Sequence, residues 1–398
     1  MRALILLTVL AVSTAITVQA QASQLTSAFE AACERTPDIV ALAARRPEVE
    51  ARVGAADALL PGGPWATVMH RTDALTNDRK TREYEAEFGI PLWLRGERGA
   101  SLAAALSGGE RLKAEIAAKR LEVAKRVRDA YWMVVEARDK VAVADRRRTT
   151  AATLAKSERS QSQAGQAQLL ESKLAEADVK DAEAALAGLR SELNQAVIAF
   201  RVLTGTTAPA AFKERDVSST VPADHPRVVL RRVAIQKAEA DENLTFASDR
   251  ERPEIAAFVN NNRDTSTEPV VTSLGLRLKI PFSYDAVNQP KRAEAAAEVV
   301  AAHEELALAE REVGGNAEQA RARLEGARQQ LKALDGRSAE LGSVVQLTEK
   351  SQQAGQVAFT DLIRSRLQLF EADLARASAR VAVERARSDL NQALGLEP

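Results

Sequence analysis

Side chains that commonly do chemistry in proteins are few in this sequence, and they are scattered along it. The three histidines are His70, His225 and His303, and the one cysteine is Cys33. The sequence has no His-Glu-x-x-His, P-loop, dinucleotide-binding glycine motif or nucleophile elbow. A dedicated metal site built from histidine and cysteine therefore has little support. We expect no enzymatic activity, no resident metal and no cofactor.

The composition indicates a helical protein that does not bind nucleic acid. Lys+Arg and Asp+Glu balance at 55 each, so no basic surface is predicted. Hydrophobic residues make up 45% of the chain but aromatic residues only 4%. That balance favours long, closely packed helices over a large globular core.

A targeting segment is expected at residues 1–20. Arg2 precedes an almost unbroken apolar run from Leu4 to Val18, and Val18-Gln19-Ala20 offers a small-residue cleavage site. The run is shorter than the about 20 apolar residues that a spanning helix needs, and no later window approaches that length. The sequence predicts export, with no transmembrane helix in the mature chain and with Cys33 at an apolar position of its first helix.

An internal repeat is the strongest signal for fold class. Two motifs recur 190 residues later, in the same order, and a third recurs 197 residues later. The recurring segments are Gln163-Ala164-Gly165-Gln166 with Gln353-Ala354-Gly355-Gln356, Ile90-Pro91-Leu92 with Ile280-Pro281-Phe282, and Leu193-Asn194-Gln195-Ala196 with Leu390-Asn391-Gln392-Ala393. Several landmarks in one order indicate a tandem duplication.

Each repeat is predicted to contain a helix, a hairpin, a very long helix, a tip and a returning helix. The first repeat covers 21–205, a linker covers 206–224, and the second repeat covers 225–398. The predicted parts are first helices at about 24–60 and 227–248, hairpins at 64–93 and 253–284, and tips at 163–166 and 353–356.

Helical periodicity supports the long helices. Apolar residues recur at spacings of 7, 4, 7 and 7, namely Ile116, Val123, Val127, Val134 and Val141. The stretches 96–163 and 291–353 contain no proline, and each would form a rod of roughly 100 Å at ~1.5 Å per residue. The glycine pairs Gly108-Gly109 and Gly314-Gly315 interrupt these stretches at positions that are not equivalent in the two repeats.

Both hairpins contain a segment that alternates with period two. Tyr84, Ala86, Phe88 and Ile90 would share one face, with Glu85 and Glu87 on the other, and residues 273–282 repeat the pattern. Such alternation is typical of strands with lipid on one side and water on the other. Two hairpins cannot close a barrel alone, so membrane strands would require oligomerisation. Two soluble amphipathic hairpins are the alternative.

The duplicated order, the proline-led hairpins and the Ala-Gly-Gln tips resemble the TolC family of outer-membrane efflux proteins, over essentially the whole mature chain. The resemblance implies a mainly α fold with a small membrane β part. Three chains would form a periplasmic α-barrel continuous with a twelve-stranded outer-membrane β-barrel, four strands per protomer. Such channels are passive exit ducts in Gram-negative bacteria. Their partners are a periplasmic adaptor, an inner-membrane pump, expected to be of the RND type, and outer-membrane lipid.

The resemblance also implies roles for particular residues. The tips, Gln163, Ala164, Gly165, Gln166 and Gln353, Ala354, Gly355, Gln356, would dock the adaptor. Asp361, six residues after Gly355, matches an acidic gate position, whereas Arg364 departs from the next one. Glu171 is the equivalent of Asp361 in the first repeat. The alternative for all three charged residues is a solvated helix face.

Two other functions remain open from the sequence. A periplasmic coiled-coil adaptor or scaffold without a pore would explain the rods and the export signal, but not the duplicated hairpins. An exit channel for type I secretion would share the whole fold. The run from Pro91 to Arg98, Pro-Leu-Trp-Leu-Arg-Gly-Glu-Arg, is similar to the heavy-metal cation branch of the family.

Overall fold

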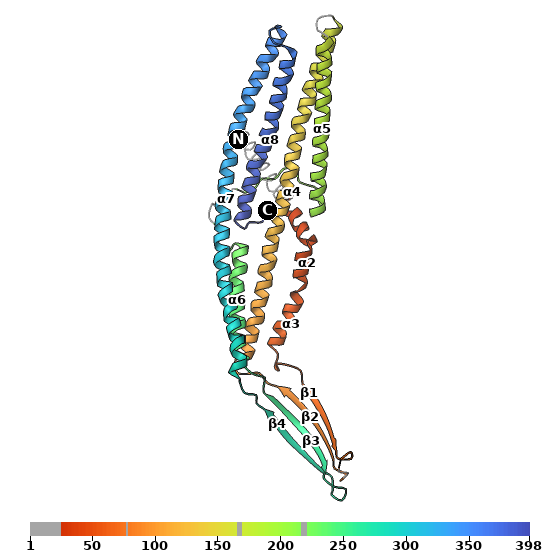
Figure 1. Cartoon of the computed structure of the whole chain (residues 1–398), viewed down its shortest axis with the longest axis vertical. Coiled ribbons are helices and arrows are strands. Elements are labelled where there is room, and N and C mark those ends of the chain that lie inside the picture. Colours follow the sequence, from red (N-terminus) through yellow and green to blue (C-terminus); the bar gives the residue numbers. More distant parts are fainter. Residues whose placement is uncertain (1–24, 77–78, 165–168, 216–220) are drawn as a thin grey trace, which may run out of the picture. The chain divides into compact units, whose positions relative to one another are not determined.

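A computed structural model describes residues 25–76, 79–164, 169–215 and 221–398 (Figure 1). The expected signal peptide lies outside these ranges. Residues 25–35 are helical and precede the labelled elements. The helices are α2 Pro37–Ala44, α3 Arg46–Ala56, α4 Glu97–Gln163, α5 Leu169–Thr204, α6 Pro226–Ala247, α7 Asp285–Gln353 and α8 Phe359–Ala393. The strands are β1 Trp65–Thr72, β2 Arg82–Pro91, β3 Glu254–Arg263 and β4 Val271–Lys279.

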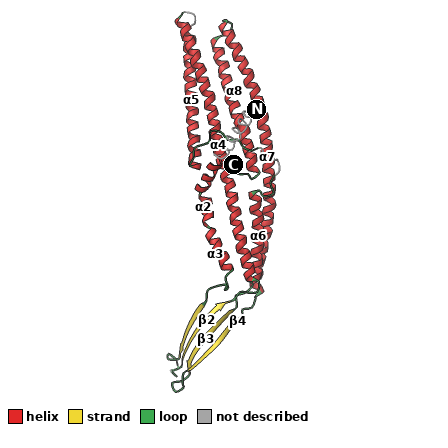
Figure 2. Cartoon of the chain, turned by 180° about the vertical axis from the view of Figure 1, so that it is seen from behind, coloured by secondary structure: helices red, strands yellow, loops and turns green. Residues whose placement is uncertain are grey.

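The two hairpins join into one antiparallel sheet, drawn in yellow in Figure 2, and the strand order is β1-β2-β3-β4. β2 and β3 come from opposite halves of the chain, yet they pair over ten residues, from Arg82 opposite Arg263 to Pro91 opposite Glu254. This central ladder continues without a break into β1 on one side and β4 on the other. The expected mainly α fold with a small sheet is confirmed.

The sheet has one apolar and one charged face, as the alternation predicts. The apolar face is exposed, and Leu274 and Leu276 on β4 are 82% and 78% accessible. The other face carries Glu83, Glu85 and Glu87 of β2. An exposed row of large apolar side chains on a sheet marks a surface that something else covers.

The chain divides into two compact units, and each draws on both halves of the sequence. The first unit comprises Met1–Val40, Ala117–Pro226 and Arg311–Pro398, and the second comprises Ala41–Ile116 and Arg227–Glu310. Helices α4 and α7 therefore contribute to both units. The division of the chain into two sequence repeats stays a prediction.

The core of the first unit forms where the N-terminal helix packs on α4. Phe29, Val127, Tyr131 and Phe200 are almost fully buried there. Cys33 belongs to the same cluster, and its burial raises the pKa of its thiol to about 11. The cysteine is thus an apolar core residue, as the sequence predicts.

A buried ion pair fixes the inter-repeat linker to the C-terminal helix in the first unit. Arg128 of α4 donates to Glu214 at 2.7 Å, and both residues are at most 5% exposed. Ser388 and Asn391 of α8 donate to the same carboxylate, at 2.7 and 2.8 Å. Arg128 also donates to the carbonyl oxygen of Leu396 at 2.8 Å. Each charge is compensated by several hydrogen bonds, which a buried pair requires.

In the second unit, the glycine pair of α4 lies against two neighbouring helices. A Cβ at Gly109 would approach the side chain of Val49 on α3 to 3.2 Å, and one at Gly108 would lie 3.6 Å from Lys237 on α6. The helix is continuous through both positions. The pair permits close helix packing and does not break the rod.

Two predicted helix boundaries are wrong. The first helix, predicted as one element over about 24–60, is three short helices, with breaks at Thr36 and Arg45. Thr36 precedes Pro37, and a residue before proline disfavours the helical conformation. Helix α7 begins at Asp285, so Pro290 lies within it, close to its N-terminal end. A proline costs least near a helix N-terminus, where few amide donors have intrahelical partners.

Among the helices of the described ranges, none has a stretch that is both long and apolar enough to cross a membrane.

We predict that Glu214→Ala destabilises the first unit by about 3–5 kcal/mol, because it leaves the guanidinium of Arg128 buried without its carboxylate. Heat unfolding followed by circular dichroism measures the loss. The double variant Arg128→Met/Glu214→Leu removes both charges and should recover most of the stability. A double variant no more stable than Glu214→Ala would contradict the explanation.

Candidate functional site

The second tip is a tight turn between two helices, at the place that its sequence predicts. Helix α7 ends at Gln353, and Gly355 follows with φ +72°, in the left-handed region that favours glycine. The Gly355 amide donates to the carbonyl oxygen of Gln352, and the Gln356 amide donates to that of Ser351, both at 2.9 Å. These two bonds form a Schellman motif, which ends α7 and lets α8 begin at Phe359.

The first tip is described only in part. Gln163 is the last residue of α4, and the Ala164 amide donates to the carbonyl oxygen of Ser160 at 3.1 Å. Gly165 and Gln166 lie outside the described residues. The docking role expected for the two tips stays a prediction.

Asp361 and Arg364 form an ion pair within one chain. The guanidinium lies 3.3 Å from the carboxylate, one turn along α8, and the two side chains are 47% and 72% exposed. Pairs this exposed contribute about 0–1 kcal/mol. The gate role of the two residues stays a prediction.

The structure adds a cavity close to the second tip that sequence reasoning missed. It has a volume of about 800 Å³ and lies among α4, α5, α7 and α8 of the first unit. Glu171, one of the predicted gate residues, lines it together with Glu158, Glu349 and Arg366. Asp361 is not among the lining residues, so the structure does not bring Glu171 and Asp361 together in this cavity. We call this space the tip cavity.

Glu158 is the least expected member of the tip cavity. It is only 5% exposed, although it lies in a polar stretch of α4. Burial raises the pKa of its carboxyl, the charge of Glu171 raises it further, and Arg366 opposes both effects. Nothing in the sequence distinguishes Glu158 from the other carboxylates of α4, because its burial depends on three other helices.

The charged face of the sheet is a second polar surface. Arg71 of β1 pairs with Glu83 at 2.6 Å, and Asn260 of β3 donates to the same carboxylate at 2.7 Å. Arg277 of β4 reaches across β3 to Glu85, at 2.9 Å, and to Glu87. These contacts connect all four strands, so the face is charged but largely paired.

Two aromatic side chains on this face cover glycines of the adjacent strand. Trp65 lies directly opposite Gly89, and Phe258 directly opposite Gly275. A Cβ at either glycine would approach the facing ring to 2.4 or 2.3 Å. The two rings can therefore occupy these places only because positions 89 and 275 have no side chain.

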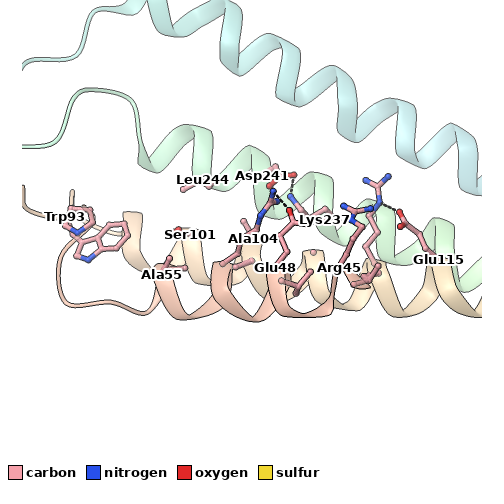
Figure 3. Close-up of a pocket in the computed structure, with 18 of the residues that line it drawn as sticks. Arg45, Glu48, Ala55, Trp93, Ser101, Ala104, Glu115, Lys237, Asp241 and Leu244 are labelled. Atoms are coloured by element: carbon pink, nitrogen blue, oxygen red, sulfur yellow. Dashed lines mark hydrogen bonds and ion pairs between the residues drawn. The ribbon is translucent and has the colours of Figure 1, made fainter. Parts of the chain in front are cut away.

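A further cavity, of about 610 Å³, lies among α3, α4 and α6 of the second unit (Figure 3). Its charged side chains pair mostly within their own helices. The pairs are Arg52–Glu48 at 2.7 Å, Arg111–Glu115 at 2.9 Å, and Lys237–Asp241. Because these charges already have partners, the cavity is a weaker candidate for ligand binding than the tip cavity.

The described part of the chain has no candidate site at which protein side chains alone could coordinate a metal ion. No three histidine, cysteine or carboxylate side chains there are placed to hold an ion together.

Known proteins resemble this chain in sequence and in fold. Residues 28–206 match the family model described as "Outer membrane efflux protein". The outer membrane protein VceC of Vibrio cholerae superposes with a TM-score of 0.72 at 14% identity, over 94% of this chain and 96% of that one. The CmeC outer membrane channel of Campylobacter jejuni gives 0.71 at 13% identity, over 93% and 85%. The family model and the shared fold both agree with the family that the sequence resembles.

Among curated proteins, the chain is similar to the cobalt-zinc-cadmium resistance protein CzcC of Cupriavidus metallidurans. The two are 23% identical over 233 residues. The match covers 54% of this chain and 56% of the relative, so it spans about half of each protein.

We predict that Glu158→Gln raises the unfolding temperature by roughly 2 °C at pH 8 in metal-free buffer, and by less at pH 5. A carboxyl with a raised pKa favours the folded state while it is protonated, and this contribution is lost as pH rises through that pKa. Glutamine stays neutral at both pH values. Glu340→Gln, at an exposed position of α7, is the matched control. An equal rise in the unfolding temperature at pH 8 and pH 5 would contradict the raised pKa of Glu158.

Proposed function

We propose that this protein is the outer-membrane channel of a tripartite efflux system and serves as a passive exit duct. The observation that carries the proposal is the four-stranded sheet, which is apolar and exposed on one face and charged on the other. Lipid accounts for the first face and a water-filled lumen for the second.

A homotrimer follows from the edges of the sheet. Within the described residues, β1 pairs only with β2, and β4 only with β3. A strand edge in lipid leaves backbone donors and acceptors without partners, at several kcal/mol each. Three copies, joined β4 to β1, would close a twelve-stranded barrel in the outer membrane. The helices would extend into the periplasm.

The partners are proposed from the family. A periplasmic adaptor would meet the two tips, and an inner-membrane pump of the RND type would deliver the substrate. Metal cations are the favoured cargo, because the CzcC name specifies cobalt, zinc and cadmium resistance. The segment Pro91–Arg98 is the sequence feature that agrees with this choice. An exit duct for type I secretion is the second candidate, since it would need the same fold. A periplasmic scaffold without a pore is disfavoured by the exposed apolar sheet face.

The trimer is tested by light scattering of the purified protein in several mild detergents. We expect a mass of three chains, together with resistance of the membrane-bound protein to alkaline extraction. A stable monomer in every detergent, or release by alkali, would exclude the channel. Cell survival in zinc, cobalt or cadmium, with and without the gene, then tests the cargo.

The gate is tested by two substitutions on α8. Asp361→Ala should reduce cation selectivity and divalent block in planar-bilayer recordings, because it removes a ring of three carboxylates. Arg364→Ala should raise open probability by up to about fivefold for each of the three chains, since each exposed pair contributes up to about 1 kcal/mol. If both variants conduct like the wild type, the gate lies elsewhere.

A further inference from the structure

Four helices each bring one ionisable side chain to the tip cavity. These are Glu158 of α4, Glu171 of α5, Glu349 of α7 and Arg366 of α8. When all are ionised, three negative charges face one positive charge. The lining of the cavity therefore has an excess of two negative charges.

The interior of the tip cavity has unused hydrogen-bonding capacity. Glu158 is 95% buried and lines the cavity, and no hydrogen bond or ion pair joins its carboxylate to another described residue. Arg366 donates to Glu349 at 3.0 Å, while its Nε and one of its terminal amino groups are buried without partners. A buried donor without a partner costs about 1–3 kcal/mol, so the two Arg366 nitrogens indicate an ordered water molecule or another acceptor in the cavity.

The remaining polar lining is rich in oxygen. Hydroxyl and amide side chains from α4 and α7 complete the wall, namely Thr149, Thr150, Thr153, Ser157, Gln161, Gln352 and Gln353. Hydroxyl and amide oxygens accept hydrogen bonds from water bound to a cation. The lining can therefore hold a hydrated ion, and its three carboxylates against one guanidinium favour a cation over an anion.

We propose that the tip cavity binds a hydrated divalent cation. A charge of +2 matches the excess negative charge. The ion must keep its water, because no three carboxylates in the described residues are close enough to coordinate it directly. Magnesium-like ions dehydrate reluctantly and commonly bind proteins through retained water. A volume of about 800 Å³ leaves room for such a hydration shell.

The bound cation would link the hairpin of α4 and α5 to the hairpin of α7 and α8. Glu158 and Glu171 lie on the first hairpin, whereas Glu349 lies on the second. Neutralising the repulsion among them removes a force that separates the two hairpins near their tips. The site is complete within one chain, so it requires neither the proposed trimer nor efflux.

Acid should weaken binding. Protonation of Glu158 removes one of the three charges, and burial keeps the pKa of this carboxyl above its ordinary value. The other groups facing it are Glu171, Glu349 and Arg366. Affinity for the cation should therefore fall as pH drops toward 5.

The test uses the full-length purified protein in detergent with Mn²⁺ as the probe. The electron paramagnetic resonance signal of free hexaaqua Mn²⁺ reports the unbound fraction. We expect the affinity to fall at least tenfold in Glu158→Gln/Glu171→Gln, and Mg²⁺ to compete in the wild type. Glu340→Gln is the matched control and should bind like the wild type. Equal affinity in the double variant and the wild type would overturn the proposal.

Asp361→Ala separates this site from a carboxylate ring at the channel axis. Affinity that falls in Asp361→Ala but persists in the double variant would place the ion at the ring and overturn the proposal. If the double variant does not fold, Mn²⁺ affinity is measured instead in each single variant, and in the wild type as a function of pH. Mn²⁺ binding that is unchanged between pH 7.5 and pH 5, or in both single variants, would equally overturn the proposal.

Discussion

Pairing between β2 and β3 is the constraint on which the rest of the second unit depends. The two strands are separated by more than 160 residues of helix and linker, yet they form ten consecutive residue pairs. This ladder places the two hairpins edge to edge, and it brings Arg277 within reach of Glu85 and Glu87. Without it each hairpin would be a two-stranded ribbon, which is at best marginally stable in water. The charged face of the sheet exists only because the two halves of the chain meet there.

The first unit uses a different interaction to join the two halves. Glu214, in the linker between them, accepts hydrogen bonds from α4 and from α8 at the same time. The linker is therefore not a passive connection. Removing two charges from water is costly, and the cost is offset here by hydrogen bonds to Glu214 from three side chains on two helices. The end of α8 and the middle of α4 are consequently held at one buried carboxylate.

Local patterns made the strands, the long helices and the second tip predictable. Period-two alternation around Phe88 and the glycine at 355 are properties of a few consecutive residues, so the sequence displays them directly. The break at Thr36 was missed although Pro37 marks it, because helical periodicity continues on both sides. The tip cavity was not predictable at all. Glu158 and Glu349 are unremarkable in polar helices, and only the packing of four helices makes one of them buried.

The two aromatic–glycine pairs in the sheet have a consequence for how the sequence can diverge. Phe258 and Gly275 face each other, so any side chain introduced at position 275 would occupy the space of the ring. Conversely, loss of the Phe258 ring with Gly275 retained would leave the glycine backbone uncovered. The two positions therefore change at low cost only together, and so do Trp65 and Gly89. Among natural variants of this chain, these pairs should be inherited as units, with the aromatic residue and the glycine gained and lost in the same lineages.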